Sequence, residues 1–289
     1  MPGIRGVYSM LAQVFLCLTL APVMSNPFKP LEQYLRKLIK YRVVRKGLIK
    51  DLSKDLSRSQ EAEQRMRTDL AFLAALNPAM AGHALPLLGD SPAQLRQDLF
   101  VLSELGFKRG GFFVEFGAAD GYNLSNSWLL ESRFAWRGVL SEPARCWHER
   151  LTKNRRCHVD TRCVWSRTGE TLEFSEVAEI STITGFGQDD AHHQARQKAT
   201  KYAVPTVSLM DLMAECEAPA DPDYLSIDTE GSEFEILRDF DFKRYPFKVI
   251  TCEHNFTPMR HKLHDLLTAA GYVRKCEEVS QFDDWYVRT

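Results

Sequence analysis

Residues 112–123 read Phe-Phe-Val-Glu-Phe-Gly-Ala-Ala-Asp-Gly-Tyr-Asn, and this stretch decides the fold of the 289-residue chain. The first five residues form a short apolar run that is typical of a buried strand, with one acid, Glu115, near its end. Small residues follow at once, at 117–121. A strand that runs into small residues and then a helix lets a ligand approach the backbone, and the free N–H groups of the helix start attract anions. The stretch therefore predicts a ligand-binding turn at the end of a buried strand.

The turn at 117–121 reads Gly-Ala-Ala-Asp-Gly and lacks the Gly-x-Gly-x-x-Gly spacing that holds the pyrophosphate of nicotinamide cofactors. An acidic strand end before such a turn suits a ligand that carries an amino group and ribose hydroxyls but no phosphate. S-adenosylmethionine is a molecule of this kind. One such turn is weak support, because glycine-rich turns after strands are common and mostly structural.

A strand followed by an acid recurs three more times along the chain. Short apolar stretches run into Glu142, Asp228 and Glu253. The carboxyl ends of parallel strands meet at one edge of a sheet, so these acids and Glu115 are expected to line one edge. A single acid there could be a solvated residue at a helix start, which the helix dipole favours, but four in register argue against that explanation. An acid after the second strand commonly binds a ribose diol, and Cys163 ends an apolar stretch where an adenine could lie.

These motifs resemble the FkbM family of S-adenosylmethionine-dependent methyltransferases. The resemblance is carried by Gly-Phe-Phe-Val-Glu-Phe-Gly-Ala-Ala-Asp-Gly at 111–121, Leu-Ser-Asn-Ser at 124–127, Ser-Ile-Asp-Thr-Glu-Gly-Ser-Glu at 226–233 and Glu-His-Asn at 253–255, and it spans residues 95–289. It implies a Rossmann-like class I methyltransferase fold, which is a mostly parallel, doubly wound α/β sheet of about seven strands, here with an N-terminal helical extension. It also implies O-methylation of a hydroxyl on a sugar or another small molecule.

By this resemblance, four strand ends would bind S-adenosylmethionine. The turn after the first strand would hold the methionine end, Glu142 the ribose and Cys163 the adenine, while Asp228 would lie beside the sulfonium. The cofactor-binding residues expected in this way are Glu115, Gly117, Ala118, Asp120, Gly121, Asn123, Ser125, Glu142, Cys163 and Asp228.

Methyl transfer to a hydroxyl needs in-line alignment and removal of a proton. His254 is the first candidate for the base, because it follows a strand end and an imidazole titrates near neutral pH. The alternative is a structural histidine bonded to a neighbouring loop. Asp228 and Glu253 are the other candidate catalytic residues. In a metal-dependent alternative, Asp228, Glu230 and Glu253 would hold a Mg²⁺ ion that binds two vicinal hydroxyls.

Composition divides the chain into a hydrophobic N-terminal segment at 1–28, a basic helical extension and linker at 29–90, and a methyltransferase domain at 91–289. With 44% hydrophobic residues, the chain can bury one substantial core. A net charge of −1 gives no basic field, so no nucleic-acid partner is expected. The expected partner is a small-molecule or glycan acceptor.

Residues 7–24 are mainly apolar, and they predict a membrane anchor. Residues 29–58 hold ten Lys and Arg against three Asp and Glu, so the positive-inside rule places the catalytic domain in the cytoplasm. A cleaved signal peptide, with a secreted product, and a mis-assigned start are the alternatives. Seven cysteines without a Cys-x-x-Cys pair fit a reducing compartment.

The pattern along the chain predicts further elements. Residues 30–76 are expected to form one or two amphipathic helices, 77–92 a linker, and 92–105 a helix that starts at Pro92. The polar stretch 185–201 is expected to be a lid over the acceptor or a solvated loop, and 283–287 a final edge strand after a strand at 271–275.

Two other classes of function stay open. One is a catalytically inactive methyltransferase-fold binding module at a membrane, against which the intact acids argue. The other is a nicotinamide-dependent oxidoreductase, against which the missing third glycine of the turn argues. The sequence does not name the acceptor or the oligomeric state.

Overall fold

The structure, a computed structural model, describes residues 29–178, 180–186 and 198–289, and it divides the chain into two compact units, Met1–Gln64 and Arg65–Thr289. Among the described residues, no helix combines the length and the apolar character that a bilayer span requires. The predicted anchor at 7–24 lies outside the described residues.

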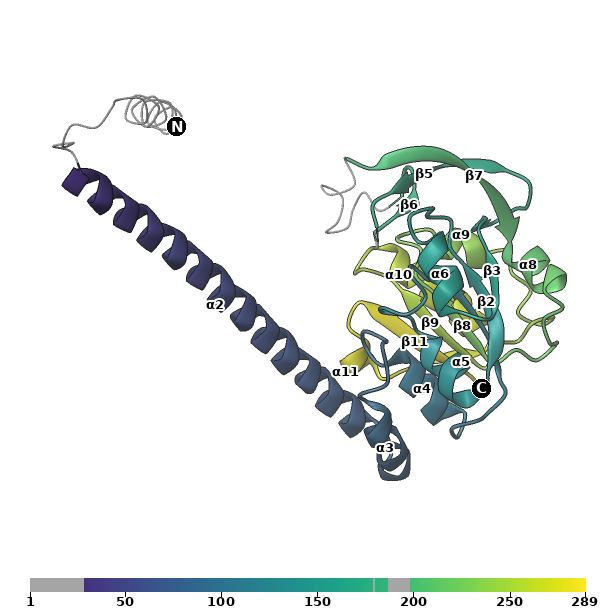
Figure 1. The fold of residues 1–289 in the computed structure, drawn as a ribbon. Helices are drawn as coiled ribbons and strands as arrows, with labels where there is room; N and C mark the ends of the chain where they lie inside the picture. Colours follow the sequence, from purple (N-terminus) through teal and green to yellow (C-terminus); the bar gives the residue numbers. More distant parts are fainter. Residues whose placement is uncertain (1–28, 179, 187–197) are drawn as a thin grey trace. The chain divides into compact units, whose positions relative to one another are not determined.

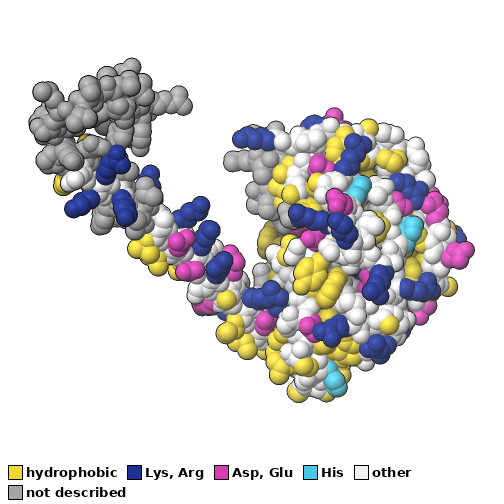
Figure 2. Space-filling model, viewed as in Figure 1, with side chains coloured by type: hydrophobic (Ala, Val, Ile, Leu, Met, Phe, Trp, Pro, Cys, Tyr) yellow, Lys and Arg dark blue, Asp and Glu magenta, His cyan; other side chains and the backbone are white. Residues whose placement is uncertain are grey.

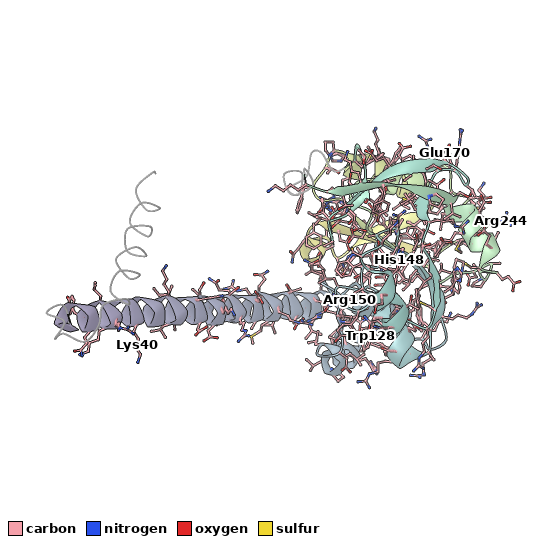
Figure 3. All side chains as sticks on the ribbon, turned by 45° about the horizontal axis from the view of Figure 1, so that its top comes forward. Lys40, Trp128, His148, Arg150, Glu170 and Arg244 are labelled. Atoms are coloured by element: carbon pink, nitrogen blue, oxygen red, sulfur yellow. The ribbon has the colours of Figure 1, made fainter. Side chains whose placement is uncertain are left out.

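A single long helix, α2 (Lys29–Ala75), confirms the helical expectation for residues 30–76. It begins in the first unit and ends in the second. Basic, acidic and hydrophobic side chains all lie along it in Figure 2, and Lys40 projects from it in Figure 3. Leu48, Ile49 and Leu52 are each more than half exposed.

Seven strands form the main sheet of the second unit, in the order β10-β11-β9-β8-β1-β2-β3 (Figure 1). The strands are β1 (Phe112–Phe116), β2 (Arg137–Ser141), β3 (His158–Asp160), β8 (Tyr224–Ile227), β9 (Val249–Glu253), β10 (Tyr272–Lys275) and β11 (Asp283–Arg288). Parallel pairing runs from β9 through β8 and β1 to β2 and β3, and β11 is antiparallel to both of its neighbours. The mostly parallel seven-stranded sheet is therefore confirmed.

Helices cover both faces of this sheet, and β1 shows why. Phe113 packs against one hydrophobic cluster, which includes Leu99 of α4 (Gln97–Glu104), Leu130 of α5 (Trp128–Phe134) and Leu151 of α6 (His148–Asn154). Val114 packs on the other face. The helices there are α8 (Leu209–Glu215), α9 (Glu233–Leu237) and α10 (Met259–Ala269). A parallel strand buried on both faces carries apolar residues on both of them, which explains the run that opens the motif, with Glu115 as its one charged residue.

A second, smaller sheet follows β3 in the chain, with the strand order β4-β7-β5-β6. Its strands are β4 (Cys163–Trp165), β5 (Thr171–Glu176), β6 (Thr182–Ile183) and β7 (Thr200–Ser208). Phe174, Ile183 and Val204 pack against Trp147 in a separate small core. The prediction of an irregular stretch at 185–201 is wrong at its end, because β7 begins at Thr200. Residues 187–197 lie outside the described residues.

The segment before β1 corrects two expectations. Residues 77–92 are not a linker, because α3 (Pro78–Ala84) and the short helix η1 (Leu85–Leu87) lie within them. The Asn77 side chain accepts a hydrogen bond from the Met80 N–H, so Asn and Pro here start a helix. The next helix begins at Gln97 and not at Pro92, because Arg96 has a left-handed backbone with φ of 72°.

At the end of the chain, one predicted strand is confirmed, and the predicted place of the other in the sheet is wrong. β10 lies where a strand was expected, and the short helix α11 (Glu277–Ser280) connects it to β11. β11 is not an edge strand, because it pairs with β9 on one side and β10 on the other.

Asp98 of α4 is a fully buried carboxyl, and it gives a first prediction about stability. Its Oδ1 accepts hydrogen bonds from the Ser91 hydroxyl at 2.7 Å and the Leu99 N–H at 2.8 Å. Burial raises its pKa to about 7. A raised pKa in the folded state means that the carboxyl stabilises the fold fully below about pH 4 and that this stabilisation is lost as the pH rises through 7. The loss is on the order of 4 kcal/mol.

We therefore expect the free energy of unfolding of the wild-type chain to fall between pH 5 and pH 8, and Asp98→Asn to reduce that fall. Urea unfolding at the two pH values measures it. An equal fall in the variant and the wild type would show that Asp98 is not responsible.

Candidate active site

A pocket opens beside the carboxyl ends of β1, β2 and β8. It contains about 560 Å³ of empty space, part of it open to solvent. Its walls are formed by Phe116, Gly117, Ala119, Ser141, Glu142, Pro143, Trp147, Cys163, Val164, Phe174, Ala178, Ser181, Thr182, Ile183, Asp228, Thr229, Glu230 and Ser232.

The turn after β1 forms one side of the pocket and packs closely on the strand beside it. Gly117 has a positive φ of 73°, and a Cβ at this position would lie 1.9 Å from the backbone oxygen of Asp228. Only glycine fits such a contact. Gly117 and Ala119 line the pocket, whereas Ala118 is buried in the core beneath. The turn thereby brings the ends of β1 and β8 together.

Further along the turn, Asp120 and Gly121 serve packing and do not line the pocket. The Asp120 carboxylate accepts hydrogen bonds from the N–H groups of Tyr122 at 3.0 Å and Asn123 at 2.8 Å, and from the Asn123 side-chain amide at 2.6 Å. This is the usual way in which an aspartate holds a turn. A Cβ on Gly121 would lie 2.6 Å from Cδ1 of Leu151, so this glycine lets α6 pack against the turn.

Glu115 lies in a buried polar network beneath the turn and is not part of the pocket wall. Its carboxylate accepts hydrogen bonds from the Asn126 N–H at 2.7 Å, the Ser125 hydroxyl at 3.0 Å and the Ser127 hydroxyl. Arg155, which is also fully buried, lies 3.6 Å from it. Burying a carboxylate is costly unless it is paired and hydrogen-bonded, and here both conditions are met. Glu115 and Ser125 therefore hold the turn from below.

Glu142 follows β2 and lines the pocket. Its two carboxylate oxygens accept hydrogen bonds from the Ala119 and Ala144 N–H groups, each at 2.8 Å. Burial raises its pKa to about 7. Figure 3 labels His148 at the start of α6, and its Nε2 lies 2.9 Å from the Glu142 backbone oxygen. Glu142 thus joins the turn after β1 to the end of β2.

Cys163 lies in an apolar part of the pocket wall. Trp147, Phe174 and Ile183 surround it in the small core beside the second sheet. Burial raises the pKa of the Cys163 thiol to about 12, so the thiol is neutral. Sequence reasoning missed Phe174 and the residues at 181–183, because nothing in their local pattern shows that the second sheet folds over this pocket.

Three acids gather beside the pocket at the ends of β8 and β9. One carboxylate oxygen from each of Asp228, Glu230 and Glu253 lies within 4.8 Å of the others. The Asp228 and Glu253 carboxyls share a hydrogen bond, and burial raises the Asp228 pKa to about 7. Burial and the charge of Asp228 raise the pKa of Glu253 well above its usual range. Two carboxyls this close cannot both ionise at neutral pH, so the pair holds one proton.

Asn255 and His254 connect this acid cluster to the loop after β9. The Asn255 side-chain amide donates to Glu253 at 2.8 Å and to Glu230 at 3.2 Å. His254 is buried, and its Nδ1 accepts a hydrogen bond from the Phe256 N–H at 3.0 Å. Burial lowers the pKa of His254, and its Nε2 lies 3.7 Å from Asp284. His254 does not line the pocket, and its contacts match the structural alternative raised from the sequence.

The structure thus divides the expected site residues into two groups. Those at the pocket wall are Gly117, Glu142, Cys163, Asp228 and Glu230. Glu253 does not line the pocket but is hydrogen-bonded to Asp228. Those placed elsewhere are Glu115, Ala118, Asp120, Gly121, Asn123, Ser125 and His254.

No curated protein sequence matches the chain significantly. Among solved structures, the methyltransferase FkbM from Methylobacillus flagellatus KT has 13% identity and a TM-score of 0.42, with 78% of this chain and 59% of that chain covered. The METTL16 MTase domain has 14% identity and a TM-score of 0.38, with 68% and 66% covered. The chain therefore spans less than two thirds of each of these structures.

The family comparison covers most of the main sheet and the pocket. The family model described as the methyltransferase FkbM domain matches residues 115–274, from Glu115 in β1 to Arg274 in β10. The matched region contains the whole pocket wall and all three acids of the cluster. Because it makes up more than half of the sequence, the chain belongs to the FkbM methyltransferase domain family.

Proposed function

We propose that this methyltransferase uses S-adenosylmethionine to methylate a hydroxyl group, and that the Asp228–Glu253 pair removes the hydroxyl proton. The observation that carries the proposal is the position of this pair. Asp228 forms part of the same pocket wall as Glu142 and lies next to the Gly117 turn, and its pKa is raised to about 7. A general base works best when its pKa lies near the operating pH.

The pocket residues fit the parts of the cofactor. The apolar wall at Cys163, Phe174 and Ile183 suits a flat adenine, and the Glu142 carboxylate suits the two ribose hydroxyls. The backbone of the Gly117 turn would hold the methionine end. S-adenosylmethionine supplies a methyl group that is already activated by its sulfonium. The chain has to align the acceptor and remove its proton.

The other expected residues support the pocket from outside it. Glu115 and Ser125 position the turn through the buried network with Arg155. His254 holds the loop after β9 through its bond to Phe256. We therefore assign Glu115 and His254 positioning roles and leave proton removal to Asp228 and Glu253.

Cofactor identity is tested by thermal unfolding with S-adenosylhomocysteine and with NADH. We expect S-adenosylhomocysteine to raise the Tm and NADH to leave it unchanged, because the pocket holds a ribose-binding acid but no pyrophosphate turn. Glu142→Gln should weaken the S-adenosylhomocysteine effect. The solvated Glu170→Gln, at the periphery of the domain in Figure 3, serves as the control. A Tm shift with NADH alone would favour the oxidoreductase, and no shift with either ligand would favour an inactive binding module.

A second candidate function of the same acid cluster is to bind a divalent metal ion. The oxygens of Asp228, Glu230 and Glu253 are close enough to bind one ion, and carboxylates are ligands that Mg²⁺ prefers. We expect activity to survive EDTA, because the shared proton and the Asn255 amide already offset charge in the cluster. Loss of activity in EDTA that Mg²⁺ restores would instead establish the metal mechanism.

A further inference from the structure

The long helix α2 carries an exposed apolar row within the first unit of the chain. Leu48, Ile49, Leu52 and Leu56 are between 56% and 61% exposed. At about 100° of rotation per residue, these four side chains fall within one sector of roughly 100° around the helix. Every residue from 46 to 64 is exposed, so no other described part of the chain packs on this row.

A basic row runs along another side of the same helix. Lys46, Lys50 and Lys54 follow each other at intervals of four residues, so they lie one above the other and away from the apolar row. Within the described part of the chain, none of these three lysines forms an ion pair with a carboxylate. The next basic residue, Arg58, lies 3.6 Å from Asp55. The lysine row is therefore exposed and uncompensated.

The charge of α2 decides between two candidate partners for its apolar row. One is a second copy of the helix, packed along the same row as in a coiled coil. Residues 33–58 hold nine Lys and Arg against two Asp and Glu, so two copies side by side would bring like charges together. The other is the surface of a bilayer that contains anionic lipids. Such a surface offers acyl chains to the apolar row and negative charge to the lysines, and it therefore complements both faces of the helix.

We propose that residues 46–58 of α2 are a docking surface for a bilayer that contains anionic lipids. The helix lies in the plane of the interface, with Leu48, Ile49, Leu52 and Leu56 in contact with acyl chains. The lysine side chains extend toward the lipid headgroups, as long basic side chains do at membrane interfaces. This inference is independent of the proposed function. It is also distinct from the predicted anchor at 7–24, which lies outside the described residues.

Hydrogen exchange measured by mass spectrometry tests this surface in the full chain. The probes are vesicles of phosphatidylcholine alone and vesicles that also contain phosphatidylserine. We expect the phosphatidylserine vesicles to slow amide exchange in peptides that cover residues 46–58, because a helix held at an interface opens less often than one in water. Phosphatidylcholine vesicles should not slow it, and high salt should reverse the effect. The readout is local, so binding through another segment does not imitate it.

A variant with Lys46→Gln, Lys50→Gln and Lys54→Gln tests the basic row. Each basic residue near an anionic membrane contributes on the order of a fivefold change in affinity. Half-maximal protection should therefore need about 100-fold more of the phosphatidylserine vesicles.

The matched control removes three exposed lysines from the second unit. It carries Lys153→Gln, Lys198→Gln and Lys243→Gln, and it has the same net charge as the first variant. We expect its protection to equal that of the wild type.

A second variant tests the apolar row. Leu48→Gln, Leu52→Gln and Leu56→Gln together should remove the protection although the lysines remain. Glutamine is nearly as good a helix former as leucine, so the helix content measured by circular dichroism should stay unchanged. Protection at the wild-type level in this variant would show that the apolar row does not enter the membrane interface.

Three further results would overturn the proposal. Equal protection by both kinds of vesicle would show that anionic lipid is not recognised. Protection without vesicles that grows with protein concentration would assign the apolar row to a second copy of the chain. Unchanged exchange in residues 46–58 under all conditions would show that α2 stays in water. None of these results bears on the S-adenosylmethionine site, which thermal unfolding tests separately.

Discussion

Replacing Asp228 by Asn should lower turnover by about 10²- to 10⁴-fold, the usual contribution of a general base. The change removes the group that takes the proton but keeps nearly the same shape in the pocket wall. It also ends the repulsion between Asp228 and Glu253, whose pKa values are both raised. We therefore expect the Tm of the variant to be equal to or above that of the wild type.

The pH dependence gives this prediction a second readout. Burial raises the Asp228 pKa to about 7, and a base acts only after it has lost its proton. Wild-type turnover should therefore rise with pH through about 7, and this rise should be absent in Asp228→Asn. Measurements of kcat between pH 6 and pH 8 compare the two. The apparent pKa belongs to the Asp228–Glu253 pair as a unit, so Glu253→Gln should shift it.

A nearby acid outside the pocket provides the control. Glu235 lies on α9 and pairs with Arg238 at 2.6 Å, so Glu235→Gln changes the local charge without touching the wall. We expect near wild-type turnover from it. If Asp228→Asn also kept near wild-type turnover, another group would remove the proton and the catalytic assignment would fail.

The second large effect is expected at Gly117. In Gly117→Ala the new Cβ would lie 1.9 Å from the Asp228 backbone oxygen. Because both atoms are fixed to the backbone, no side-chain rotation can relieve this contact. The left-handed φ of 73° adds a cost of about 1–2 kcal/mol. We expect the free energy of unfolding to fall by clearly more than this cost. S-adenosylhomocysteine binding should be lost, because the turn and the end of β8 must separate.

Gly169 is a matched control for this change. It has a similar φ of 83°, but a Cβ there meets no atom within 4 Å. Gly169→Ala should therefore show the conformational cost alone, with S-adenosylhomocysteine affinity unchanged. Urea unfolding and calorimetric titration of both variants separate the two terms. Equal destabilisation by the two changes would show that the contact with Asp228 adds little to the loss of free energy of unfolding.

Sequence reasoning located the strand ends and the acids near them, for a simple physical reason. A parallel strand buried on both faces is mostly apolar, so the acids and small residues that follow it mark the edge of the sheet. Gly117, Glu142 and Asp228 were identified in this way, and the structure places them around one pocket. The closeness of Glu230 and Glu253 to Asp228 follows from the pairing of β8 with β9.

Tertiary structure alone decided where the remaining side chains point. Glu115 shares a face of β1 with Phe113, and α6 brings Arg155 to that face, 40 residues later in the chain. The His254 imidazole lies 3.7 Å from Asp284 and does not line the pocket. The apolar wall at Phe174 comes from a separate sheet. Local sequence sets the period of a strand and the end of a helix. Partners distant in the chain decide that the Glu115 carboxylate is paired with Arg155. They also decide that Asp228 is left at the pocket with a raised pKa.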